Sequence, residues 1–152
     1  MTPLRTIIVD DEPLALNLMR AKLNKFDSID VVAECKNGQE AIEAIRENEP
    51  DLVFLDIQMP KINGFEVIHK IQSELTPMVL FATAYEQYAL DAFKVNAVDY
   101  ILKPLDNEQL SRAVSRAEQR YLQLDKSQEK SNLISAIEAI RHHPDSNYQH
   151  TA

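Results

Sequence analysis

The sequence predicts an α/β fold in which a doubly wound, five-stranded parallel sheet lies between two layers of helices. Five short runs rich in β-branched and aromatic residues alternate with five segments of helical spacing. The runs are apolar on both faces, which is typical of strands that are covered on both sides. Strict alternation of strand and helix requires right-handed crossovers, and these produce three layers.

The predicted strands cover residues 5–9, 30–35, 51–55, 77–82 and 97–102. After each strand, apolar residues recur every three or four positions, as on the buried face of an amphipathic helix. They are Ala15, Met19, Leu23 and Phe26; Ala41, Ile42 and Ile45; Ile68, Ile71 and Leu75; Ala89 and Phe93; and Leu110, Val114, Ala117, Tyr121 and Leu124. Functional groups are expected at the carboxyl ends of the strands in such a sheet.

Composition and charge limit the possible functions. The chain has 152 residues, 45% hydrophobic and 26% charged, and its net charge of −8 should repel a nucleic-acid backbone. Cys35, the single cysteine, lies in an apolar run, which favours a buried thiol in a reducing compartment such as the cytoplasm. The N-terminus does not resemble a signal peptide, and the longest uncharged stretch, 75–85, is too short to span a bilayer. No membrane partner is therefore predicted.

The pattern changes after Leu124, so we divide the chain into a domain, 1–124, and a tail, 125–152. Residues 125–132 are polar and predict a linker. A second apolar stripe predicts a short helix that ends before Pro144, and the last eight residues are expected to be disordered. The stripe consists of Leu133, Ile134, Ile137 and Ile140. Such a stripe needs a partner surface, which indicates that the tail docks elsewhere or was cut from a longer chain.

Acidic residues end two of the predicted strands. Asp10, Asp11 and Glu12 follow the first strand and Asp56 follows the third. These strands are neighbours in the usual doubly wound order, so the acids should converge. At about 4 Å and an effective dielectric constant near 20, each pair of carboxylates repels by roughly 4 kcal/mol. Such a cluster suits Mg²⁺, which prefers oxygen ligands and is often held beside phosphate groups.

Helix capping is the alternative explanation for two of these acids. Asp10 and Asp11 precede Pro13, and aspartate before proline is a common start of a helix. Capping would be the preferred explanation for a single acid, but not for three acids that converge from two strands.

The fourth and fifth strands end in residues that suit an anion. Thr83 offers a small hydroxyl, and Lys103, followed by Pro104, offers a compact positive charge. Each is weak evidence alone, because threonine is common in turns and lysine is usually solvated. Only two glycines occur, Gly38 and Gly64, which excludes a glycine-rich phosphate loop. The order of acids, hydroxyl and lysine therefore predicts phosphoryl chemistry of another kind.

The chain resembles the receiver domain of two-component response regulators. The match covers residues 3–122 and rests on VDDE at 9–12, LDIQMP at 55–60 with a following glycine, ATA at 82–84 and DYILKP at 99–104. The resemblance implies a CheY-like, flavodoxin-like fold. It also implies that Asp56 accepts a phosphoryl group from a sensor histidine kinase, and that the protein is a phosphoacceptor, not an enzyme with an external substrate.

The resemblance further implies a metal site. Asp11, Asp56 and the main-chain carbonyl of Gln58 would bind Mg²⁺, for which Mn²⁺ can substitute, and Asp10 would help through a water molecule. Gln58 and Tyr85 stand where this family tunes the access of the water that hydrolyses the phosphoryl group.

A switch is implied as well. Thr83 and Lys103 would hold the phosphoryl oxygens, and the inward movement of Thr83 would let Tyr100 move inside, with Ala84 part of the same switch. The Lys103–Pro104 peptide would be cis. The change would reach the face of the fourth helix, fifth strand and fifth helix, where a homodimer is implied. Without the motif, Tyr100 would be an ordinary edge aromatic with its hydroxyl in water.

Residues 83–105 resemble, more narrowly, receivers that carry a C-terminal LytTR DNA-binding domain. This implies that the output is transcription, with DNA bound only by an effector domain absent from these 152 residues. The chain would then end in the linker between the domains, or else be a stand-alone regulator. The acidic charge and the unfinished tail favour the first alternative.

Two other classes of protein fit less well. Phosphatases of the haloacid dehalogenase type also use an aspartate at the end of a strand, but need a second aspartate two residues later, where this chain has Gln58. A phosphorylation-independent interaction module is the other alternative. It lacks support, because the acceptor, metal and lysine positions are all filled.

Overall fold

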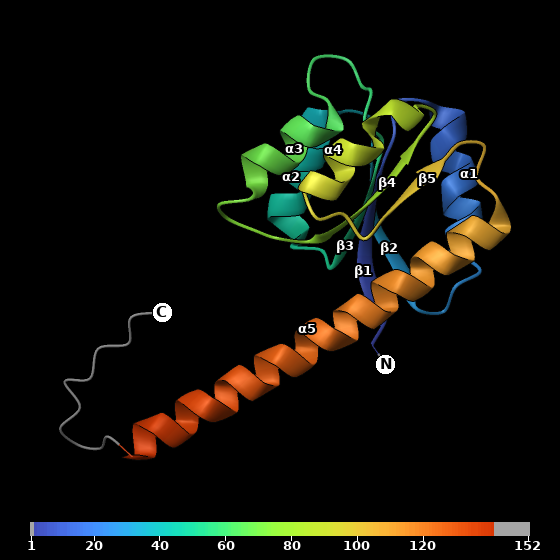
Figure 1. Cartoon of the computed structure of the whole chain (residues 1–152). Coiled ribbons are helices and arrows are strands. Elements are labelled where there is room, and N and C mark those ends of the chain that lie inside the picture. The colour runs from blue at the N-terminus through green and yellow to red at the C-terminus, as the bar shows by residue number, and fades with distance from the viewer. Residues whose placement is uncertain (1, 142–152) are drawn as a thin grey trace. The chain divides into compact units, whose positions relative to one another are not determined.

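Five parallel strands form one sheet in the computed structural model, which describes residues 2–141. The strand order is β2-β1-β3-β4-β5, which confirms the predicted doubly wound fold (Figure 1). The strands are β1 (Leu4–Val9), β2 (Ile29–Cys35), β3 (Leu52–Leu55), β4 (Met78–Thr83) and β5 (Asp99–Leu102). Each boundary lies within two residues of the predicted one.

The helices are α1 (Pro13–Leu23), α2 (Gly38–Asn48), α3 (Gly64–Ile71), the short 3₁₀ turn η1 (Glu86–Tyr88), α4 (Ala89–Lys94) and α5 (Asn107–Arg141). Asparagine begins both α2 and α3. The side chain of Asn37 accepts a hydrogen bond from the N–H of Glu40, and Asn63 forms a reciprocal capping box with Glu66. These caps fix the start of both helices at the carboxyl end of the sheet.

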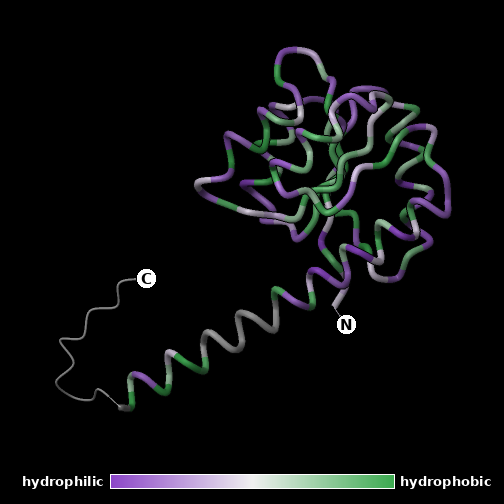
Figure 2. The backbone as a smooth tube through the Cα atoms, viewed as in Figure 1, coloured by the Kyte–Doolittle hydropathy of each residue, from purple (hydrophilic) through white to green (hydrophobic). Residues whose placement is uncertain are grey.

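The sheet has an apolar layer on each side because successive strand residues face opposite ways. On one side Ile7, Val9, Val53, Leu55 and Phe81 pack with buried residues of α2, α3 and α4. Figure 1 shows these three helices on one side of the sheet and α1 on the other. Figure 2 shows hydrophobic residues concentrated on the central strands. The carboxyl ends of the strands are left for polar residues.

The chain divides into two units, 1–118 and 119–152. The buried apolar residues of α5 all lie in the first unit, and Ala117 is the last of them. This explains why the boundary falls a few residues before the predicted one at 124.

The segment 125–132, predicted to be a linker, is helical, and α5 continues through it to Arg141. Its polar composition misled the prediction. The segment contains neither glycine nor proline, and its lysine, glutamine and glutamate residues favour helix nearly as well as leucine does.

In the second unit, the described apolar side chains of Leu133, Ile134, Ile137 and Ile140 are exposed. The predicted helix stop at Pro144 and the predicted disorder at 145–152 lie outside the described residues. Within residues 2–141, no helix is both long and apolar enough to cross a membrane.

Candidate phosphoacceptor site

Strand register brings the acidic residues together. β1 and β3 are neighbours, and Val9 pairs with Leu55, so Asp10 and Asp56 leave the sheet at the same level. The N–H of Asp56 donates to the carbonyl of Val9 at 3.1 Å, and the N–H of Asp10 donates to the carbonyl of Cys35 at 3.0 Å. The backbone of both acids is therefore held by the sheet.

Three carboxylates converge at this edge. Asp10, Asp11 and Asp56 each offer one oxygen, and these oxygens lie within 4.8 Å of one another. Asp10 is 0% exposed and Asp56 is 6% exposed, and Asp11 is the most accessible of the three. Glu12, which the sequence grouped with them, is exposed and is not a member of this cluster.

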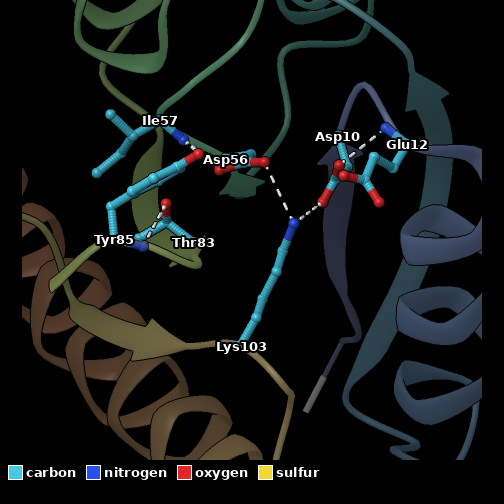
Figure 3. Close-up of polar contacts among 7 residues, drawn as sticks. All are labelled: Asp10, Glu12, Asp56, Ile57, Thr83, Tyr85 and Lys103. Carbon is cyan, nitrogen blue, oxygen red and sulfur yellow. Dashed lines mark hydrogen bonds and ion pairs between the residues drawn. The ribbon is translucent and has the colours of Figure 1, made fainter.

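Lys103 supplies the opposite charge. Leu102 of β5 pairs with Thr83 of β4, and the N–H of Lys103 donates to the carbonyl of Thr83 at 2.8 Å. Its Nζ donates to Oδ2 of Asp10 and, at 3.2 Å, to Oδ2 of Asp56. Figure 3 shows the ammonium between the two carboxylates. The Lys103–Pro104 peptide bond is cis.

The second oxygen of each buried carboxylate is bound by the backbone. Oδ1 of Asp56 accepts from the N–H of Ile57 at 2.7 Å, and Oδ1 of Asp10 accepts from the N–H of Glu12 at 3.0 Å. Asp10 thus orders the turn before α1, but the residue at the helix cap is Glu12, whose side chain makes no capping bond. Capping does not account for Asp11 or Asp56.

Burial and charge act in opposite directions on the ionisable groups here. Burial raises the pKa of Asp56, and the nearby Asp10 carboxylate adds to this rise, while the Lys103 ammonium reduces it. For Lys103, burial alone would lower the pKa, but its bonds to Asp10 and Asp56 outweigh this and raise it. Lys103 is therefore held in its charged form, where it offsets part of the negative charge of the cluster.

The residues fit a divalent metal of the magnesium type. Oxygen ligands of Mg²⁺ lie about 2.1 Å from the ion, so neighbouring or opposite ligand oxygens are about 3–4 Å apart. Carboxylate oxygens within 4.8 Å of one another reach this spacing with small side-chain rotations, or with one of them acting through water. Within the described residues, this is the only group of three or more acidic, histidine or cysteine side chains placed to hold a metal.

Glycine is required close to Asp56. A Cβ atom on Gly64 would lie 2.6 Å from the carbonyl oxygen of Asp56 and 3.1 Å from the Cα of Ile57. The N–H of Gly64 donates to the carbonyl of Ile57 at 2.8 Å. Helix α3 therefore begins directly against the backbone of Asp56 and Ile57. A residue larger than glycine at position 64 would push the start of the helix away from them.

The predicted switch residues surround a single loop. Thr83 is fully buried, and its hydroxyl accepts a long bond of 3.4 Å from the N–H of Tyr85. The hydroxyl of Tyr100 donates to the carbonyl of Tyr85, and its ring lies 6.4 Å from that of Phe81. Ala84 lies between Thr83 and Tyr85 in the chain and is exposed. The hydroxyl of Tyr100 thus has a protein partner and does not point only to water.

A cleft of about 770 Å³ opens beside Asp56. Asp11, Asp56, Gln58, Tyr85 and Lys103 line it, together with Ala84 and Tyr88. Sequence reasoning missed Tyr88, whose hydroxyl accepts a hydrogen bond from Nε2 of Gln58 at 2.8 Å. The sequence does not show that this side chain lines the cleft, because the orientation of Tyr88 depends on the 3₁₀ turn η1 in which it lies.

Comparison with known proteins shows the family of the chain. The model of the response regulator receiver domain family matches residues 6–115. The chain belongs to this family. Receiver domains serve two-component systems, where they act as regulators that interact with histidine kinases and effector domains, and the family generally binds Mg²⁺.

Similar proteins are longer regulators. An uncharacterised response regulatory protein of Yersinia pestis is 45% identical over 140 residues, which is 92% of this chain and 56% of that protein. The transcriptional regulatory protein BtsR of Salmonella typhi is 42% identical over 124 residues, 82% of this chain and 52% of BtsR. The chain thus spans about half the length of the curated relatives that it matches.

Solved receiver domains share the fold. The response regulatory domain of protein mrkE from Klebsiella pneumoniae is 28% identical, with a TM-score of 0.72 over 78% of this chain and 98% of that domain.

Proposed function

We propose that Asp56 accepts a phosphoryl group from a sensor histidine kinase and that this modification switches an output. The convergence of Asp10, Asp11 and Asp56 beside the ammonium of Lys103 carries the proposal. Three carboxylates and one cation suit a divalent metal and a phosphoryl group together. A surface that only binds proteins has no need of such a cluster.

Asp56 would act as the nucleophile. One of its carboxylate oxygens attacks the phosphorus of a phosphohistidine or of a small acyl phosphate. The new P–O bond forms as the P–N or P–O bond to the leaving group breaks, and the leaving group keeps the electron pair. Lys103 offsets negative charge on the phosphoryl oxygens, so catalysis consists mainly of positioning and neutralisation. The domain catalyses only changes to its own phosphorylation state.

Asp11, Asp56 and the main-chain carbonyl of Gln58 would hold Mg²⁺, or Mn²⁺ in its place, with Asp10 acting through water. When bound, the metal supplies positive charge that stabilises the transferring phosphoryl group. The spacing of the three carboxylates supports this assignment.

The switch would begin at Thr83. Its hydroxyl accepts a long bond of 3.4 Å from the Tyr85 N–H, and it can at the same time donate its own hydrogen to a phosphoryl oxygen. Movement of Thr83 and Ala84 would allow Tyr100 to leave the Tyr85 carbonyl and pack inside. The neighbouring helix α4 exposes Leu90 and Phe93, at 78% and 83%, which supports a homodimer through the α4-β5-α5 face.

Transcription is the output that we infer, because the longer relatives include transcriptional regulators. DNA would be bound by a C-terminal effector domain of the LytTR type, since the acidic receiver is unsuited to it. The protein would work in the cytoplasm, where phosphodonor kinases act and where Cys35 would stay reduced. A stand-alone regulator that acts through α4-β5-α5 is the alternative.

Intact mass spectrometry tests the acceptor. With Mg²⁺ and a small acyl phosphate, the wild-type protein should gain one phosphoryl group and Asp56→Asn should gain none. Equal labelling of the variant would refute the assignment. Sedimentation with a beryllofluoride analogue tests the dimer, and an unchanged monomer would count against it.

A further inference from the structure

A hydrogen bond joins two residues that line the cleft beside Asp56. Nε2 of Gln58 donates to the hydroxyl of Tyr88 at 2.8 Å. Gln58 lies in the loop between β3 and α3, two residues after Asp56, whereas Tyr88 ends the η1 turn after β4. Both side chains line the cleft that contains Asp56. The bond therefore joins two of the loops that line the cleft containing Asp56.

Tyr88 is the fixed partner of this pair. Its ring packs edge-on against Phe65 of α3, with centroids 6.1 Å apart, and against Tyr85, with centroids 6.3 Å apart. The side chain is half-buried, while Gln58 is exposed. Because the ring is held on two sides, its hydroxyl can determine where the flexible Gln58 side chain rests.

We propose that Tyr88 is a positioning residue that holds Gln58 across the cleft and so slows hydrolysis of the phosphoryl group on Asp56. This inference rests on the proposed function. In hydrolysis, a water oxygen attacks phosphorus, the bond from phosphorus to the Asp56 oxygen breaks, and the electron pair returns to the carboxylate. The two protons of the water leave with the product as dihydrogen phosphate. Asp56 is only 6% exposed, so the water must come through the cleft that Gln58 and Tyr88 border.

The Tyr88→Phe variant tests this directly, because it removes the hydroxyl and keeps the ring. After donor removal, the phosphoryl group should leave the variant about two- to tenfold faster than the wild type, the factor that corresponds to one neutral hydrogen bond. Intact mass against time gives the rate. Tyr121→Phe is the matched control, since Tyr121 lies in the other unit, and its rate should equal that of the wild type.

A double-mutant cycle separates positioning from general loosening of the loop. Gln58→Ala should also shorten the lifetime, and Gln58→Ala with Tyr88→Phe should be no faster than Gln58→Ala alone, because Tyr88 acts through Gln58. Multiplicative effects of the two substitutions, or an unchanged or longer lifetime in Tyr88→Phe, would overturn the inference. Failure of the wild type to take up a phosphoryl group would instead refute the proposed function on which the inference rests.

Discussion

Two ion-paired regions of the first unit differ in burial. At the carboxyl ends of β1 and β3, the carboxylates of Asp10 and Asp56 are almost fully buried and share the ammonium of Lys103. On the surface, Arg46 of α2 binds Glu74 through two bonds of 3.1 and 3.0 Å, and both side chains are nearly half exposed. Water screens the surface pair, so it should contribute about 0–1 kcal/mol, whereas buried charges depend on their neighbours. Ion pairs are therefore informative about function here only where they are buried.

Removal of the buried cation should have the largest effect. Lys103→Met leaves the carboxylates without their ammonium, and we expect phosphorylation of Asp56 by a small acyl phosphate to slow by about 100-fold or more. Intact mass against time measures this rate. Lys70→Met removes an exposed lysine of α3 and should leave the rate unchanged. Equal rates in Lys103→Met and the wild type would show that the buried pair has no chemical role.

Loss of one carboxylate should weaken metal binding. Asp11→Asn replaces a charged ligand with a neutral one, and we expect its affinity for Mg²⁺ to fall by about tenfold or more. Titration calorimetry measures the affinity without any phosphodonor. Asp30→Asn, at an exposed position on β2, is the control and should bind Mg²⁺ as the wild type does. An unchanged affinity in Asp11→Asn would remove Asp11 from the site.

Neutralisation of the acceptor should stabilise the fold at neutral pH. Burial raises the pKa of Asp56 above its unfolded-state value of about 3.9. The stability that comes from its neutral form is therefore complete below that unfolded-state pKa. This stability is lost as the pH rises through the higher folded-state pKa. In EDTA at pH 7, Asp56→Asn should therefore melt about 2–6 °C higher than the wild type. The gain should disappear below about pH 4, and a gain of the same size at both pH values would contradict this origin.

The surface pair should matter least. Glu74→Gln should lower the free energy of unfolding by less than about 1 kcal/mol, because the pair is exposed. Urea denaturation measures the change. A loss above about 2 kcal/mol would erase the contrast between the two regions.

Most of the fold follows from local sequence patterns. The five strands could be located because they contain short apolar runs such as 7–9 and 52–55, and the pairing of the first and third strands followed from the usual order of a doubly wound sheet. The expected irregular backbone at 125–132 is helical instead, because polarity is not itself a sign of irregular backbone and nothing in that segment interrupts a helix. The ability of a segment to form a helix and the burial of that helix are separate properties. The spacing of apolar residues indicates mainly burial.

The convergence of the acidic residues was predictable for a geometric reason. Asp10 and Asp56 directly follow strand residues, so parallel register alone places them together. The bond between Gln58 and Tyr88 was not predictable, because it depends on the orientation of a tyrosine in a 3₁₀ turn and on its packing against Phe65. Backbone register can be inferred from sequence more readily than the direction of a side chain in a loop.

Borohydride trapping tests the central claim most directly. The reagent reduces an aspartyl phosphate to homoserine and so records which carboxylate carried the phosphoryl group. After treatment with Mg²⁺ and a small acyl phosphate, peptide sequencing should find homoserine at position 56 alone. Homoserine at Asp10 or Asp11, or at no position in protein that has gained phosphoryl mass, would contradict the account.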